Sequence, residues 1–204
     1  MIKIAVTKGR IEKEFLKLIE QTDLDASFVE NKKRKLVIKT QDNIEMIFVK
    51  SNDVLKFIEQ GTADIGIIGN DTLEENDFKN YIELLDLKIG KCFFALAGFK
   101  EYKKSTTPKR IATKYPNITK KYFKNIGEDV EIIKMEGSIE VAPIVGIADG
   151  IIDIVETGNT LQENGLTIIK KIFNVSTRVI ANKSSLIYKE DDINIIIEKI
   201  KQVI

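Results

Sequence analysis

Short runs rich in isoleucine and valine alternate with helix-like segments along this chain, and no other feature limits its fold so strongly. The pairs are, in chain order, 2–6 with 11–20, 44–49 with 53–60, and 65–68 with 72–75. Brief apolar runs of this kind are typical of parallel strands that helices cover on both faces. The alternation therefore predicts an α/β fold built mainly on parallel pairing.

At least one pair of strands is expected to run antiparallel. Lys35 to Thr40 and Ile44 to Val49 flank the polar tripeptide 41–43, which is typical of a hairpin loop. We therefore expect a mixed sheet.

A second series of strands and helices begins near Lys91. Its expected elements are 92–97, 110–113, 120–126, 130–134, 139–147, 151–155 and 166–175, then a strand at 177–181 and a final helix from about Asp191. The helix expected at 139–147 is largely apolar. The final helix is so rich in isoleucine that we expect burial on both of its sides or packing against another subunit.

Charge and composition exclude several classes of function. The 32 basic and 31 acidic residues leave a formal charge of +1, so no global field attracts nucleic acid or an anionic membrane. The chain has no histidine, which excludes Ser-His-Asp and Cys-His catalysis and leaves few ligands for zinc. Its one cysteine, Cys92, cannot form an internal disulfide. The first apolar run is too short for a signal peptide or membrane span, so we expect a cytoplasmic protein.

The strongest local signal is a strand that runs into two acids and a small polar turn. The residues are Asp153, Glu156, Thr157, Gly158, Asn159 and Thr160. Backbone N–H groups and two hydroxyls of such a turn can converge on a phosphate, while the acids can accept hydrogen bonds from ribose hydroxyls or hold a metal ion. The alternative is a simple strand-to-helix turn in which one of the threonines caps the helix.

Two other strand ends carry groups suited to a ligand. Lys8-Gly9-Arg10 follows the first strand, where an α/β sheet opens its ligand crevice. Asn70-Asp71 follows the strand 65–68 and Gly69, so Asp71 can meet a hydroxyl or Mg²⁺. The alternatives are a solvated basic helix start for the first segment and a helix cap for the second.

Two further segments are ambiguous when each is taken alone. Thr113 to Thr119 places Lys114 and Tyr115 before a helix, and Glu136 to Glu140 places acids and a hydroxyl at another helix start. Such residues more often serve turns and caps.

Taken together, these segments resemble the ATP phosphoribosyltransferases of histidine biosynthesis. The matching segments are 7–10, 61–66, 85–87, 112–119, 136–140, 155–161 and 176–178. They cover nearly the whole chain in order, and the pair 113–119 and 155–161 is highly specific.

The resemblance implies a two-domain fold like that of type II periplasmic binding proteins, with mixed sheets and an active-site cleft between domains. Domain I would comprise 1–90 plus 176–204, and domain II would comprise 91–175 and carry the phosphoribosyl pyrophosphate loop. We expect no regulatory domain after the last helix, so the resemblance is to the short form. That form works with a regulatory subunit resembling histidyl-tRNA synthetase, and we expect a homodimer within a hetero-oligomer.

The implied reaction transfers the phosphoribosyl group of phosphoribosyl pyrophosphate to N1 of ATP, with Mg²⁺ accompanying the substrates and no metal site of the protein's own. The turn 157–160 would hold the 5′-phosphate, and the two acids would hold the ribose hydroxyls. Lys8, Arg10, Arg34 and Lys50 would face pyrophosphate and triphosphate. Asp71 would lie near ribose or metal, and Tyr115 near adenine.

Two positions depart from the family pattern. The family usually has arginine where this chain has Lys50 and Phe93, and lysine keeps the charge but loses the bidentate fork. Two other functions stay open, because a fold does not fix a function. One is a cytoplasmic small-anion binding module of the same fold without catalysis, and the other is a phosphoribosyltransferase acting on another base.

Overall fold

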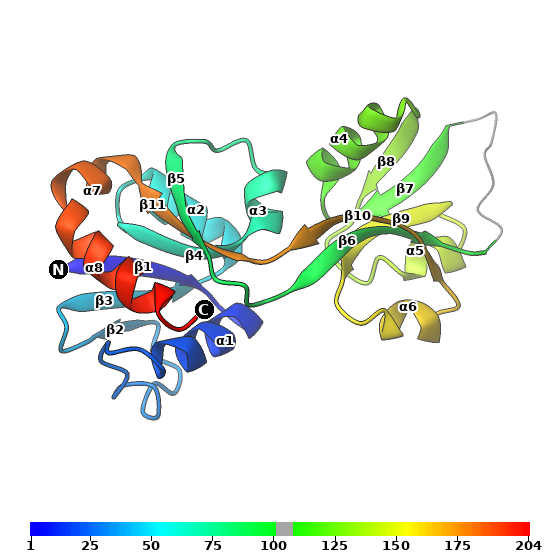
Figure 1. The fold of residues 1–204 in the computed structure, drawn as a ribbon. Helices are drawn as coiled ribbons and strands as arrows, with labels where there is room; N and C mark the ends of the chain where they lie inside the picture. The colour runs from blue at the N-terminus through cyan, green and yellow to red at the C-terminus, as the bar shows by residue number, and fades with distance from the viewer. Residues whose placement is uncertain (101–107) are drawn as a thin grey trace. The chain divides into compact units, whose positions relative to one another are not determined.

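The computed structural model describes residues 1–100 and 108–204, and its contacts divide the chain into two compact units (Figure 1). The first combines Met1–Leu73, Asp77–Gly90 and Ser176–Ile204, and the second combines Glu74–Asn76 and Lys91–Val175. The domain bounds expected from the sequence differ from these only at 74–76, which were placed with the first unit.

The first unit is built on a six-stranded sheet in the order β2-β3-β1-β4-β11-β5. β1 lies parallel to β3 and β4, whereas β2 is antiparallel to β3, and β11 is antiparallel to β4 and β5. This pairing confirms the mixed sheet and the hairpin. The elements are β1 (Ile2–Thr7), α1 (Arg10–Ile19), β2 (Val37–Lys39), β3 (Ile44–Val49), α2 (Ser51–Glu59), β4 (Ile65–Gly69), α3 (Asn70–Glu75, its last two residues counting with the second unit), β5 (Tyr81–Asp86), β11 (Thr177–Asn182), α7 (Lys183–Tyr188) and α8 (Glu190–Lys201).

Helices cover both faces of this sheet. Successive residues of a strand point to opposite sides, so neighbouring residues of β1 pack against different helices. Ile4 of β1 belongs to a core cluster that includes Phe15 of α1 and Ile197 of α8. Its neighbour Ala5 belongs to another cluster, with Val54 of α2. The largely apolar run of β1 is thus explained by burial on two sides.

The helix α8 buries one face. Ile193, Ile196, Ile197 and Ile200 are buried at the spacing of an amphipathic helix, while Ile195 is 57% exposed. The expectation that this helix is buried on both sides is therefore wrong within the chain, and packing against another subunit stays a prediction. No helix in the described part of the chain, α8 included, has the length and apolarity of a membrane span.

The second unit is built on a five-stranded mixed sheet in the order β10-β6-β9-β7-β8. β7 is parallel to β8 and β9, and β6 is antiparallel to β9 and β10. The elements are β6 (Cys92–Gly98), β7 (Lys109–Thr113), α4 (Pro116–Ile126), β8 (Val130–Lys134), α5 (Val141–Ile144), β9 (Gly150–Val155), α6 (Asn159–Glu163) and β10 (Thr167–Val175). Phe94 packs with Phe123 of α4 on one face, and Ala95 packs with Leu161 of α6 on the other.

Two helices of this unit differ from their expected bounds. α4 begins at Pro116 rather than 120, because proline lacks the N–H that a first helical turn leaves unbonded. The nine-residue helix expected at 139–147 is wrong, since α5 spans only Val141–Ile144. Gly146 follows with φ 75°, a left-handed conformation that ends the helix.

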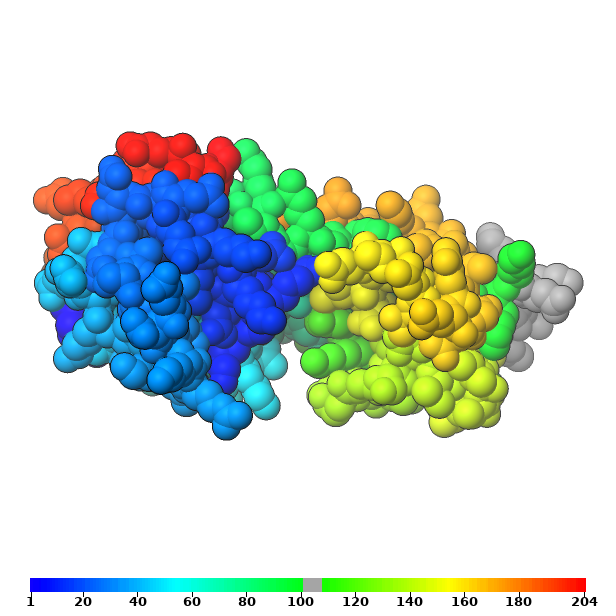
Figure 2. Space-filling model, turned by 90° about the horizontal axis from the view of Figure 1, so that it is seen from below, coloured from blue at the N-terminus to red at the C-terminus, as the bar shows by residue number. Residues whose placement is uncertain are grey.

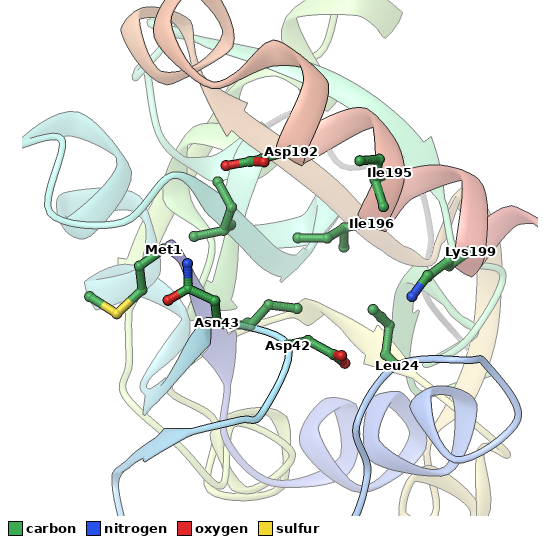
Figure 3. A pocket seen from close by; sticks show the side chains of 10 residues that line it. Met1, Leu24, Asp42, Asn43, Asp192, Ile195, Ile196 and Lys199 are labelled. Carbon is green, nitrogen blue, oxygen red and sulfur yellow. The ribbon is translucent and has the colours of Figure 1, made fainter.

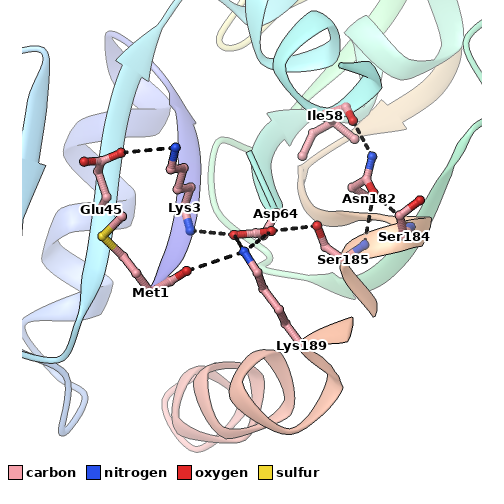
Figure 4. Close-up of polar contacts among 9 residues, drawn as sticks. All are labelled: Met1, Lys3, Glu45, Ile58, Asp64, Asn182, Ser184, Ser185 and Lys189. Atoms are coloured by element: carbon pink, nitrogen blue, oxygen red, sulfur yellow. Dashed lines mark hydrogen bonds and ion pairs between the residues drawn. The ribbon is translucent and has the colours of Figure 1, made fainter. Parts of the chain in front are cut away.

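One buried carboxylate fastens the C-terminal helices to the first sheet (Figure 4). Asp64, just before β4, is 4% exposed and accepts hydrogen bonds from the backbone N–H of Lys3 at 2.8 Å, Ser185 Oγ at 2.6 Å and Lys189 Nζ at 2.8 Å. Burial by itself raises the pKa of Asp64, but the bonds from Lys189, Ser185 and Lys3 outweigh it and hold the pKa below its ordinary value.

Asp64→Asn should lower the free energy of unfolding at pH 7 by about 2 to 4 kcal/mol, because the amide leaves Lys189 without its anion. Since the folded pKa is lowered, the carboxylate's contribution is complete above about pH 4 and is lost as pH falls through the lowered pKa. Urea unfolding from pH 7 down to about pH 2 should show the gap between variant and wild type closing. A gap that does not change with pH would contradict this role.

Candidate functional site

A pocket of about 230 Å³ in the second unit surrounds the turn that follows β9. The part of the chain that forms α6, yellow in Figure 2, lies at the surface. The lining residues are Glu140, Asp153, Ile154, Val155, Glu156, Thr157, Gly158, Thr160 and Leu161. Of the six residues predicted to hold phosphoribosyl pyrophosphate, the structure brings all but Asn159 into this lining.

The turn depends on a glycine conformation. Gly158 has φ 84° and ψ 1°, in the left-handed region that favours glycine. A Cβ there would meet Ile168 and Val155 only at ordinary contact distance, 3.8 Å, so backbone conformation rather than space selects the residue. The turn directs β9 into α6 within three residues of the strand's end.

The geometry does not favour the capping alternative for the threonines. The cap position of α6 is Gly158, and the helix has no side-chain cap. Thr157 Oγ1 does accept a hydrogen bond from the Asn159 N–H, but the distance of 3.4 Å is long. Thr157 and Thr160 are both exposed and line the pocket, where their hydroxyls can meet a ligand.

Asp153 is a carboxyl whose pKa departs far from its ordinary value. The pKa of Asp153 is raised to about 6, mainly by burial and in smaller part by the negative charge of Glu140. A hydrogen bond from the Ile154 backbone and the charge of Lys114 lower it in part. A ligand hydroxyl or cation that reaches this group would favour its ionised form.

Glu140 and Lys114 were not among the predicted site residues. Both belong to segments that the sequence singled out, 136–140 and 113–119, but only strand order shows why they matter. β7 lies parallel to β9 with Thr113 opposite Ile152, and Thr113 Oγ1 donates to the Ile152 carbonyl at 2.8 Å. The residue after β7 therefore arrives beside Asp153.

Tyr115 packs in the core of the second unit. Its ring meets that of Phe94 edge to face, with centroids 4.8 Å apart. Its N–H donates to Thr113 Oγ1 at 2.9 Å, and it precedes α4 as the cap residue. The predicted contact with adenine stays a prediction.

In the first unit, strand order gathers three of the predicted residues at one edge of the sheet. β1 lies between β3 and β4 and runs parallel to both, so the residues that follow these strands share the carboxyl edge. Lys8 and Lys50 follow β1 and β3 and are exposed, and the Lys8 N–H donates to the Val49 carbonyl at 2.8 Å. Asp71, half-buried in α3, follows β4.

The two arginines differ in their surroundings. Arg34 is exposed in the segment before β2. Arg10 is engaged within the first unit, because its Nη2 donates to the Gly90 carbonyl at 2.8 Å and its Nε lies 3.7 Å from Glu14. These contacts hold the chain where it leaves the first unit, and the predicted phosphate role of Arg10 stays a prediction.

A second pocket, of about 220 Å³, lies at the opposite edge of the first sheet (Figure 3). Its lining includes Ile2 and Ile44, the first residues of β1 and β3, together with Ile195, Ile196 and Lys199 of α8. Ligands of open α/β sheets bind at the carboxyl ends of the strands, so this pocket is not the candidate site.

The comparisons with known proteins agree on one family. A family model described as ATP phosphoribosyltransferase matches residues 50–202. The chain is 54% identical over 203 residues to an ATP phosphoribosyltransferase from Lactococcus lactis, covering 98% of each chain.

Two solved structures agree with the fold. A chain of the HisG:HisZ ATP phosphoribosyl transferase complex from Thermotoga maritima is 34% identical with a TM-score of 0.84, over 100% of this chain and 98% of that one. The periplasmic aliphatic sulphonate binding protein SsuA from Escherichia coli, 12% identical with a TM-score of 0.62, covers 99% of this chain and 72% of that one. This second likeness shows the fold alone and confirms the periplasmic-binding-protein type.

Asp153→Asn should be more stable relative to wild type at high pH than it is at low pH. Because the folded pKa is raised, the folded chain keeps its proton between about pH 4 and 6, and ionisation lowers stability as pH rises through that window. The variant should gain about 1 to 2 kcal/mol on wild type in going from pH 4.5 to pH 8, measured by guanidinium unfolding.

Asp149→Asn is a suitable control in the same unit. A hydrogen bond from the Arg110 backbone holds the pKa of Asp149 below its ordinary value, so this variant should show no such gain. Equal behaviour of the two variants would contradict the environment described for Asp153.

Proposed function

Because this chain belongs to the ATP phosphoribosyltransferase family, which catalyses the first step of histidine biosynthesis, we propose that its second-unit pocket holds phosphoribosyl pyrophosphate. The single observation that carries this proposal is the pocket around Gly158, where a polar turn and the half-buried carboxylate of Asp153 lie together. The turn suits a phosphate, and the carboxylate suits a sugar.

The turn 157–160 would bind the 5′-phosphate. Its two threonine hydroxyls and the backbone N–H groups at the start of α6 are donors, and a phosphate offers only acceptors at neutral pH. Gly158 allows the backbone to approach the phosphate closely.

Asp153 and Glu156 would accept hydrogen bonds from the ribose hydroxyls. Glu140 adds a further carboxylate on the same pocket. Mg²⁺ would enter with the substrates, whose phosphate oxygens are ligands that it prefers. Bound Mg²⁺ would neutralise charge on the departing pyrophosphate.

The reaction needs no protein nucleophile. The N1 lone pair of adenine attacks C1 of the phosphoribosyl group, the bond from C1 to the pyrophosphate oxygen breaks, and pyrophosphate leaves with that electron pair. The protein supplies alignment and cations for the departing charge. We assign that role to Lys8, Lys50 and Arg34, with Arg10 as a further phosphate contact. Asp71 would lie near ribose or metal, and Tyr115 near adenine.

We also propose a regulatory partner. The structural relative from Thermotoga maritima is a complex of HisG and HisZ, and this chain matches one of its chains over 98% of that chain's length. A regulatory subunit of that kind, a homodimer of this chain within the assembly, and a cytoplasmic location are parts of the proposal. The relatives do not favour the non-catalytic binding module.

Thr160→Ala should raise the Michaelis constant for phosphoribosyl pyrophosphate about tenfold and change that for ATP by less than about twofold, because the hydroxyl is assigned to one substrate only. The assay follows pyrophosphate release with ATP, phosphoribosyl pyrophosphate and Mg²⁺, with and without the regulatory partner. Gln162→Ala, an exposed change on the same helix, is the control. Equal effects of Thr160→Ala on both substrates would count against the loop assignment.

Lys50→Met should lower kcat by about one to two decades, because one charge-assisted contact to departing pyrophosphate is lost. Lys56→Met, on the exposed part of the neighbouring helix α2, should leave kcat within about twofold. Measuring both variants under saturating substrates separates the site cation from a general loss of positive charge. No difference between them would remove Lys50 from the site.

A further inference from the structure

Lys32 is a buried cation outside the set of proposed site residues. It is 8% exposed, and its Nζ lies 2.5 Å from Glu12 Oε1 and 4.1 Å above the centre of the Phe48 ring. Lysine is seldom buried unless its charge is paired. Here one carboxylate and one aromatic face hold the ammonium, so it is already engaged and is not presented to a phosphate.

The other oxygen of Glu12 reaches the turn that carries Lys8. Glu12 Oε2 accepts a hydrogen bond from the Gly9 N–H at 3.3 Å, as the acid of a capping box at the start of α1. Gly9 has φ 96° and ψ −129°, a conformation that glycine alone adopts readily. With the Lys8 N–H bonded to the Val49 carbonyl, both amides of the turn have fixed acceptors.

Three segments that carry the proposed phosphate cations therefore meet at the side chain of Lys32. Glu12 joins Lys32 to the turn of Lys8, and Phe48 lies two residues before Lys50. Arg34 follows Lys32 by two residues along the chain. Each of these links lies within the first unit.

We propose that Glu12 is a positioning residue: its carboxylate, paired with Lys32, accepts from the Gly9 N–H and thereby holds Lys8 beside Lys50. This inference rests on the proposed role of Lys8 and Lys50 at the pyrophosphate. Glu12 acts through the turn of Gly9 and does not touch substrate. What the turn requires is an acceptor at position 12, and the ion pair with Lys32 allows a carboxylate to be that acceptor.

Two double variants test this requirement. Glu12→Gln with Lys32→Met, the amide double variant, removes the ion pair but leaves an amide oxygen that can accept from Gly9. Glu12→Met with Lys32→Met, the thioether double variant, removes the ion pair and the acceptor together. Both replace a buried pair by neutral side chains of similar length, so neither leaves an unpaired buried charge.

Activity and local exchange are measured on the full chain with its regulatory partner. The amide double variant should keep kcat within about threefold of wild type, and the thioether double variant should lose about tenfold with little change in the Michaelis constant for ATP. The Gly9 amide should exchange with solvent about tenfold faster only in the thioether double variant. Lys189→Met, which breaks the pair with Asp64 at the other edge of the sheet, is the control for general destabilisation.

Equal kcat and equal Gly9 exchange in the two double variants would overturn the proposal, as would a loss in Lys189→Met that matches the loss in the thioether double variant. Lys8→Ala distinguishes the possible failures. No loss of activity in Lys8→Ala shows that the cation assignment itself is wrong, and the proposal falls with it. A loss in Lys8→Ala with equal activity of the two doubles shows that the cation is correct and the positioning role is not.

Discussion

Parallel pairing of neighbouring strands is the constraint on which the candidate site depends. In the first unit, β1 runs parallel between β3 and β4, and in the second, β7 runs parallel between β8 and β9. Parallel strands that lie side by side end at the same edge, so residues far apart in sequence arrive together there. Lys8 meets Lys50 in this way in one sheet, and Lys114 meets Asp153 in the other. No local turn brings about either meeting.

The second unit places a half-buried carboxylate in the lining of its pocket. Asp153 lies on β9 between apolar neighbours, on the face that α5 and α6 cover, and burial raises its pKa to about 6. A partly buried acid with a raised pKa costs stability when it ionises, and such acids are common where a protein receives a ligand. Arg10 differs from Asp153, because its guanidinium already bonds within the fold, where Nη2 donates to the Gly90 carbonyl.

The sequence allowed the local elements to be predicted wherever one short segment contained the whole signal. The strand-turn-helix around Gly158 and the hairpin that ends at Val49 follow from apolar runs broken by small polar residues. Glu140 was missed because its proximity to Asp153 depends on which strands are neighbours. The helix expected at 139–147 failed because apolar residues alone do not continue a helix, and Gly146 stops it in the left-handed region. The links from Lys32 to Glu12 and from Asp64 to Lys189 join residues far apart in sequence, which no pattern of spacing shows.

The order of strands in the first sheet also sets the order in which the chain can fold during synthesis. β11 lies between β4 and β5 and is antiparallel to both, so β5 has no neighbour in the sheet until Thr177 and the residues after it have been made. Nearly all of the second unit is continuous in sequence, from Lys91 to Val175, and its sheet needs nothing from either chain end. On the ribosome, the inserted unit can therefore form its core before β11, the strand that joins β5 to the rest of the first sheet, has been made.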